Sequence, residues 1–114
     1  MKRFRILILC AILSAAGTVA AFSQASAAGK GDATKGKDVF DSNCSPCHNA
    51  DSEEKKVGPG LKGLFAKDKM SNGKKATDAT VRERIDNGGN GMPAYKEILA
   101  DSEKDDVIAY LKTL

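Results

Sequence analysis

The chain has one histidine, three cysteines and no tryptophan. A structural zinc site takes four nitrogen or sulfur ligands, usually arranged as two separated pairs. Cys44, Cys47 and His48 lie together, but no further cysteine or histidine follows to complete such a site, and Cys10 stands apart in an apolar run. No second histidine is present to act as an acid–base group beside the first. These shortages exclude a typical zinc domain and catalysis by a pair of histidines.

The N-terminus has the three parts of a secretory signal peptide. Residues 1–5 are basic, residues 6–22 are apolar and small, and Ala25-Ser26-Ala27 offers an A-x-A cleavage site. The apolar run is a little short for a membrane span, so we favour cleavage over a retained anchor. Cys10 lies too early, and lacks the preceding small residues, for a lipoprotein signal. We therefore predict a cleaved signal peptide over residues 1–27 and a periplasmic location.

Cleavage changes the charge balance of the chain. The full chain has 18 basic and 15 acidic side chains, and its formal net charge is +3. Lys2, Arg3 and Arg5 leave with the signal, so 15 charges of each sign remain. A net charge near zero gives no reason to expect nucleic-acid binding. We expect a flexible leader over residues 28–32 and one domain over residues 33–114, monomeric and without a membrane span.

The densest group of reactive side chains is Cys44-Ser45-Pro46-Cys47-His48. The C-x-x-C-H pattern is typical of c-type haem attachment. Two intervening residues match the separation of the cysteine sulfurs to that of the two porphyrin vinyl groups, each of which takes one thioether bond. The histidine follows at once, so its imidazole can bind the iron from one face. The motif predicts one haem c, covalently attached through Cys44 and Cys47.

Two other interpretations use the same cysteines without haem. A redox dithiol normally follows a buried strand, whereas Cys44 follows the polar residues Asp41, Ser42 and Asn43. A disulfide between Cys44 and Cys47 would close a very small loop and stabilise the fold little. The third alternative, zinc, lacks ligands. Haem is favoured because it uses both thiols and the imidazole.

Few aromatic residues remain after residue 27. They are Phe40, Phe65, Tyr95 and Tyr110. This is a thin apolar inventory for so small a domain. A covalently held porphyrin would supply the missing apolar bulk, so we expect the haem-free chain to be largely unfolded.

Apolar residues recur at helical spacing, which predicts an all-α domain with no strand. The expected helices cover residues 33–43, a short segment near 61–65, residues 78–87, and a last segment that runs to about residue 113. Asp32 and Thr77 are suitable N-caps for the first and third helices, and Gly88 is a suitable stop. Asp101 or Ser102 is expected to cap the last helix.

Met92 is the predicted second axial ligand of the iron. It follows the glycine-rich residues 87–91 and precedes Pro93, so flexible backbone can bring its sulfur to the metal. A thioether is a soft, neutral ligand, and Met/His ligation raises the reduction potential. The alternatives are that Met92 is a core residue, or that Met70 is the ligand. Met70 lies in a charged loop that lacks apolar support, so we prefer Met92.

The turn Gly58-Pro59-Gly60-Leu61 follows the attachment motif. An iron-bound imidazole usually donates its other N–H to a carbonyl, and the rigid turn at Pro59 could supply that acceptor. An ordinary turn proline explains the residue equally well. Leu61 begins an i, i+3, i+4 apolar pattern, and we include Leu61 and Pro59 among the predicted cofactor-binding residues.

From about residue 33 to residue 114 the chain resembles the small bacterial class I cytochromes c with one haem. Five ordered motifs carry the resemblance: Gly36-x-x-x-Phe40, Cys44-x-x-Cys47-His48, Gly58-Pro59-Gly60-Leu61, residues 87–94 and residues 107–111. The resemblance implies a helical shell around haem, with the N- and C-terminal helices packed together and one porphyrin edge exposed.

Residue by residue, the resemblance implies that Cys44 and Cys47 carry the haem and that His48 and Met92 are its axial ligands. It also implies that the Pro59 carbonyl accepts the His48 ring N–H. Gly36 and Phe40 would pack against the C-terminal helix near Tyr110 and Leu111. The chain departs from some members in having no tryptophan, and in having Gly60 directly after the Gly-Pro pair.

The resemblance further implies one-electron transfer between larger redox proteins, and no enzymatic activity. The alternative is a peroxidase-like enzyme or a ligand-binding cytochrome with a labile Met92. Such a protein needs a distal acid–base group, and the chain has no second histidine to provide one.

Residues 55–75 contain seven lysines and one acid, Asp68, whereas residues 30–54 and 76–114 each have a net charge of −3. A solvated surface is the plain interpretation of this basic run. Docking of a redox partner near Lys67–Lys75 is the functional one, and it predicts association that weakens with salt.

Overall fold

The computed structural model describes residues 31–114. The predicted signal peptide, residues 1–27, and residues 28–30 of the predicted leader lie outside the described residues. The described elements are the helices α1 (Ala33–Asn43), η1 (Leu64–Ala66), α2 (Asp78–Asn87) and α3 (Asp101–Leu111), where η1 is a short 3₁₀ helix. Over residues 31–114 the all-α prediction is confirmed, and no helix in this range is long and apolar enough to cross a membrane.

The start of α1 is fixed by Asp32. Its carboxylate accepts the backbone N–H groups of Thr34 and Lys35 at 2.8 and 3.3 Å, which satisfies two of the free donors of the first turn. The backbone N–H of Asp32 donates to the Asp106 carboxylate of α3 at 2.7 Å. The last residue of the predicted leader is therefore held against the fold.

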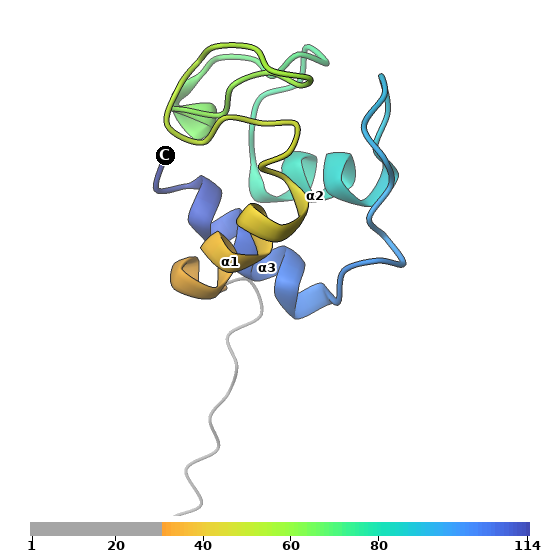
Figure 1. Ribbon diagram of the computed structural model, residues 1–114. Helices are drawn as coiled ribbons and strands as arrows, with labels where there is room; N and C mark the ends of the chain where they lie inside the picture. The colour runs from red at the N-terminus through yellow and green to blue at the C-terminus, as the bar shows by residue number, and fades with distance from the viewer. Residues whose placement is uncertain (1–30) are drawn as a thin grey trace, which may run out of the picture.

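α1 packs against α3 at Gly36 and Phe40 (Figure 1). A Cβ at Gly36 would lie 1.9 Å from the carbonyl oxygen of Asp106, so only glycine permits this close approach. The rings of Phe40 and Tyr110 are tilted by 58° with centroids 5.4 Å apart, a favourable aromatic arrangement. The packing of the first helix on the last is confirmed.

The core lies where the three α-helices meet. Phe40 and Val107 are the largest side chains with less than 2% of their surface exposed. The buried apolar residues are Phe40, Leu64, Ala76, Val81, Ile85, Leu99, Val107, Ile108 and Leu111. This core is small, and three of its members, Leu64, Ala76 and Leu99, lie outside the three α-helices.

α2 has the bounds and the N-cap that its sequence predicts. The side chains of Thr77 and Thr80 each accept the backbone N–H of the other residue, at 3.2 and 2.9 Å. Val81 and Ile85 are buried, as the spacing predicts. Gly88 follows the helix with a positive φ of 64°, which glycine adopts without a steric cost.

The predicted cap of α3, Asp101 or Ser102, is wrong by one or two residues. α3 begins at Asp101, and Ala100 is its N-cap residue. Alanine has no side-chain acceptor, so Glu103 takes part instead: its carboxylate accepts the backbone N–H of Ala100 at 2.8 Å. The helix also ends at Leu111, two residues before the expected end near Thr113.

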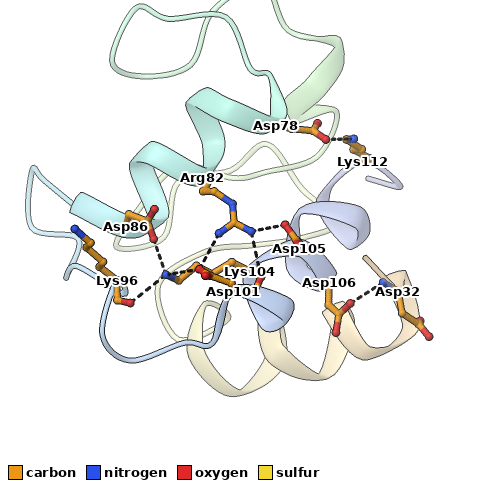
Figure 2. Close-up of polar contacts among 10 residues, drawn as sticks. All are labelled: Asp32, Asp78, Arg82, Asp86, Lys96, Asp101, Lys104, Asp105, Asp106 and Lys112. Atoms are coloured by element: carbon orange, nitrogen blue, oxygen red, sulfur yellow. Dashed lines mark hydrogen bonds and ion pairs between the residues drawn. The ribbon is translucent and has the colours of Figure 1, made fainter. Parts of the chain in front are cut away.

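Charged side chains join α2 to α3 (Figure 2). The Arg82 guanidinium contacts the carboxylates of Asp101 and Asp105, and the Lys112 ammonium lies 2.5 Å from the Asp78 carboxylate. Most of these groups are at least partly exposed, and exposed ion pairs contribute little each. They add to a contact between helices that is smaller than the one between α1 and α3.

Two connections carry the predicted site. Residues 44–77 join α1 to α2 and contain η1, and residues 88–100 join α2 to α3. In the view of Figure 1 the first connection spreads over the upper left of the molecule, and the second rises at the right.

Candidate functional site

The attachment motif continues directly from α1. The backbone N–H of Cys44 donates to the Phe40 carbonyl at 2.8 Å, and that of His48 donates to the Cys44 carbonyl at 2.9 Å. The chain therefore keeps a helical turn through the motif, which holds both thiols and the imidazole close in space. Cys44 and Cys47 are half-buried and are not joined in a disulfide.

The imidazole of His48 is oriented by the turn at Gly58 and Pro59. His48 Nδ1 lies 2.8 Å from the Pro59 carbonyl oxygen. A carbonyl only accepts, so Nδ1 carries the proton and donates, which leaves the Nε2 lone pair free to bind a metal. A Cβ at Gly58 would lie 2.5 Å from His48 Cε1, so glycine is needed for the backbone to lie against the ring. The contact of Gly58 with the imidazole was not predicted from the sequence.

The polar segment after His48 folds back on the motif. The backbone N–H of Gly58 donates to the Cys47 carbonyl, and that of Leu61 donates to the Asn49 carbonyl, both at 2.8 Å. Leu61 is half-buried and packs against the core. These bonds fix the distance between the motif and the Pro59 carbonyl.

Met92 lies at the end of a tight hairpin turn. The backbone groups of Gly89 and Met92 exchange two hydrogen bonds, at 2.9 and 3.1 Å. Asn90 and Gly91 lie between them with φ of 52° and 87°. Positive φ at both central residues and an Asn-Gly pair define a type I′ turn. The glycine-rich sequence is therefore explained by the geometry that holds Met92.

Tyr95 ties the Met92 segment to the attachment motif. Its backbone N–H donates to the Ile85 carbonyl at 2.9 Å, and its hydroxyl donates to the Asn43 carbonyl at 3.0 Å. Burial raises the pKa of the Tyr95 phenol, with smaller effects from the neighbouring Cys44 and Cys47. Sequence reasoning missed this role, although an aromatic residue three positions after Met92 was a signal.

Met70 and Met92 have different surroundings. Met70 is half-buried and packs against the core, so the expectation that it lacks apolar support is wrong. Met92 is also half-buried, but it is not among the described residues that pack on that core. The structure thus gives Met70 an ordinary packing role and leaves the Met92 thioether without one.

The thiol of Cys44 is in a poor environment for redox catalysis. Burial, with a smaller contribution from Cys47, raises the pKa of Cys44 to about 11. Dithiol oxidoreductases depend on a cysteine whose pKa is lowered. The surroundings of Cys44 therefore argue against the dithiol alternative and fit a covalent attachment point.

The donors and surfaces around the motif fit haem c. Two thiols and an imidazole with Nε2 free are the sulfur and nitrogen donors that haem attachment and ligation use. Half-buried apolar side chains pack against the core without being covered completely. They include Val39, Ala50, Leu61, Phe65, Met70 and Tyr95. A flat apolar group bound here would cover part of their remaining exposed surface.

A helical domain with a C-x-x-C-H segment at the end of its first helix is the architecture of a protein with covalently attached porphyrin. Residues 31–111 match the family model described as cytochrome C oxidase, cbb3-type, subunit III. The chain is similar to cytochrome c6 of Synechocystis sp., with 37% identity over 90 residues that cover 79% of this chain and 72% of that protein. It is 35% identical over 99 residues to cytochrome c of Tetrahymena pyriformis, which covers 75% of this chain and 91% of that protein.

Among solved structures, cytochrome c6 from the diatom Phaeodactylum tricornutum is similar in fold. Its TM-score is 0.57 at 28% identity, and the match covers 73% of this chain and 93% of that chain. The chain belongs to the cytochrome c family, as a small class I member with one haem. It is a haem c electron carrier, and its haem is attached through Cys44 and Cys47.

Proposed function

We propose that this protein is an exported one-electron carrier, and not an enzyme, whose haem iron is held by His48 and Met92. The hydrogen bond from the Tyr95 hydroxyl to the Asn43 carbonyl supports this assignment most directly. It joins the segment that bears Met92 to the end of α1, next to Cys44 and His48. The bond links the two segments that carry the proposed iron ligands.

Each residue of the site has a separate task in this proposal. Haem c supplies a one-electron Fe(III)/Fe(II) couple when it is bound. Cys44 and Cys47 retain the group covalently at a partly exposed position. The Pro59 carbonyl keeps His48 in one tautomer and one orientation, and this hydrogen bond also makes Nε2 a stronger ligand for the iron. Met92 fills the remaining position, so that no open site is left for a substrate.

Export to the periplasm is the second part of the proposal. It rests on the basic, apolar and A-x-A segments of residues 1–27. A C-x-x-C pair that receives haem outside the cytoplasm also accounts for the presence of two close thiols in an exported chain.

The ligand assignment is tested with a Met92→Ala variant of the holoprotein. We expect it to lose the methionine–iron charge-transfer band of the oxidised spectrum. Its reduction potential should fall by on the order of 0.1 V, because axial ligands tune haem potentials over about 0.8 V and a methionine ligand raises them. Optical spectra and a redox titration measure both effects.

Met70→Ala is the matched control, since it removes a methionine that packs on the core. It should unfold more easily and keep the band. Loss of the band in Met70→Ala, or its retention in Met92→Ala, would contradict the assignment. A high-spin wild-type protein that binds carbon monoxide at once when reduced would instead favour the ligand-binding alternative.

Partner docking through the basic connection is the third part of the proposal. Within the described chain, Lys67 already pairs with Glu53 at 3.3 Å and Lys74 pairs with Glu83 at 2.8 Å. Lys69 and Lys75 are exposed and make no ion pair with a described residue. No carboxylate of the described chain therefore offsets the charge of these two lysines, which leaves it available to an acidic partner.

A Lys69→Gln, Lys75→Gln double variant tests this surface. With ferricyanide as a small anionic oxidant, we expect the oxidation rate at low ionic strength to fall severalfold and the difference to vanish at high salt. The control is Lys35→Gln, Lys37→Gln on α1, which makes the same change in net charge elsewhere. Equal rates for all three proteins at low salt would remove the docking proposal.

A further inference from the structure

Lys104 is a buried charged residue of α3. Only 3% of its surface is exposed, and among residues 31–114 it is the one polar or charged residue that is buried. It precedes Val107 and Ile108 by three and four positions, so it lies on the apolar face of α3. A buried charge is costly unless it is paired and hydrogen-bonded, so the partners of this ammonium have to offset that cost.

The partners of Lys104 come from three segments (Figure 2). Its Nζ lies 2.8 Å from Asp86 Oδ1, donates to the Lys96 carbonyl at 3.0 Å, and lies 3.5 Å from Asp101 Oδ1. Asp86 Oδ1 is buried and has no partner in residues 31–114 apart from this ion pair. The hydrogen bond to the Asp86 carboxylate raises the pKa of Lys104, which favours the charged ammonium.

Asp86 and Lys96 lie at the two ends of the loop that carries Met92. Asp86 belongs to the last turn of α2, and Lys96 follows Met92 by four residues. The backbone N–H of Lys96 also donates to the Asp86 carbonyl, at 3.3 Å. The Lys104 ammonium therefore contacts both ends of this loop where they are hydrogen-bonded to each other.

We propose that Lys104 is a positioning residue for Met92: its contacts with Asp86 and the Lys96 carbonyl hold the loop closed and keep the thioether on the iron. The inference rests on the proposed His48 and Met92 ligation. A soft thioether binds ferric iron less strongly than ferrous iron, so the oxidised protein depends more on a closed loop.

Imidazole measures how often the loop opens, because it binds the oxidised iron only when Met92 has left it. Its apparent affinity is proportional to the open fraction. In a titration of the oxidised holoprotein followed by absorbance, we expect Lys104→Met to bind imidazole about tenfold more tightly than the wild type. Asp86→Asn should change the affinity in the same direction, and Lys104→Arg should restore most of the wild-type value.

Two controls separate positioning from general stability. Lys37→Met removes an exposed lysine that pairs with Asp41 on α1, and it should leave imidazole binding unchanged. Val107→Ala removes core packing one turn along α3 and should lower the melting temperature. If Val107→Ala tightens imidazole binding as much as Lys104→Met at an equal loss of melting temperature, the positioning role is overturned.

Met92→Ala distinguishes failure of this inference from failure of the ligand assignment. If Met92→Ala keeps the wild-type oxidised spectrum and imidazole affinity, Met92 is not the ligand, and the role of Lys104 falls with it. If Met92→Ala changes both while Lys104→Met and Asp86→Asn change neither, the ligand assignment stands and the positioning role alone is overturned. Should Lys104→Met fail to fold, Asp86→Asn and Lys104→Arg give the same comparison.

Discussion

Gly58 and Pro59 fix the His48 imidazole between a backbone surface and a carbonyl oxygen. The hydrogen bond of 2.8 Å selects the tautomer, and the absence of a side chain at residue 58 allows the ring to lie where that bond forms. Gly58 and Pro59 therefore determine the direction of the His48 nitrogen that we propose as an iron ligand.

A Gly58→Ala variant tests this arrangement. The new Cβ would lie 2.5 Å from the imidazole, so the ring or the turn has to move and the bond to Pro59 is weakened. We expect the holoprotein to lose about 1–3 kcal/mol of unfolding free energy and its His48 Nδ1–H resonance to shift. Denaturant titration and proton NMR measure these changes.

Gly63→Ala is the control for Gly58→Ala. A Cβ at Gly63 meets nothing within 4 Å, and only the positive φ of 66° opposes the substitution. It should leave the His48 resonance in place. An unshifted resonance in Gly58→Ala would contradict the role given to the glycine.

α1 and α3 form the largest contact between helices, and its closeness depends on Gly36. The Asp32 and Asp106 side of this contact is polar, whereas Phe40 and Tyr110 make its aromatic side. Because Cys44 follows α1 directly, a change in the packing of α1 on α3 would also move the attachment motif.

Gly36→Ala should therefore separate the two helices. Its Cβ would lie 1.9 Å from a backbone oxygen of α3, and backbone yields less easily than the end of a flexible side chain. We expect a loss near the upper end of the cost of overpacking, about 3 kcal/mol, in the unfolding free energy of the holoprotein. Lys35→Ala, at an exposed neighbouring position, should change it little, and equal midpoints for the two variants would refute the close approach.

The sequence predicts α1 and α2 well because their caps are local signals. Asp32 and Thr77 each bond to backbone groups within three residues. The start of α3 was predicted one or two residues too late, because Glu103 reaches back to Ala100 and alanine is not a recognised cap. The burial of Lys104 was missed, although its spacing from Val107 and Ile108 placed it on the apolar face.

The candidate site was also predicted only in part, because some of its features are local and others depend on the fold. The attachment motif is five consecutive residues, so the sequence alone predicts its chemistry. The bond from Tyr95 to Asn43 joins residues 52 positions apart, and the pair of Lys104 and Asp86 joins two helices. Contacts of that range depend on how the chain folds, and composition or periodicity does not specify them.

The domain as a whole has little apolar material of its own. Nine apolar side chains are buried among the described residues, and two of the half-buried residues beside them are Cys44 and Leu61 of the site. A core of so few side chains supplies only a small net stability to a small domain. The cofactor is therefore expected to be part of the core and not an addition to it.

A Cys44→Ala, Cys47→Ala variant tests this dependence. Without covalent attachment we expect the chain to be largely unfolded and to show no cooperative thermal transition by circular dichroism. Ser42→Ala and Ser45→Ala, which change neighbouring residues without removing a thiol, should melt cooperatively when they carry haem. A native-like transition in the double cysteine variant would show that the polypeptide folds alone.

The account depends above all on one porphyrin joined to two cysteines of an exported chain. The intact mass of the protein, purified from the periplasm of cells competent in haem attachment, tests this most directly. We predict the mass of residues 28–114 plus that of one haem, retained under denaturing conditions. A mass equal to that of the polypeptide alone would contradict the account.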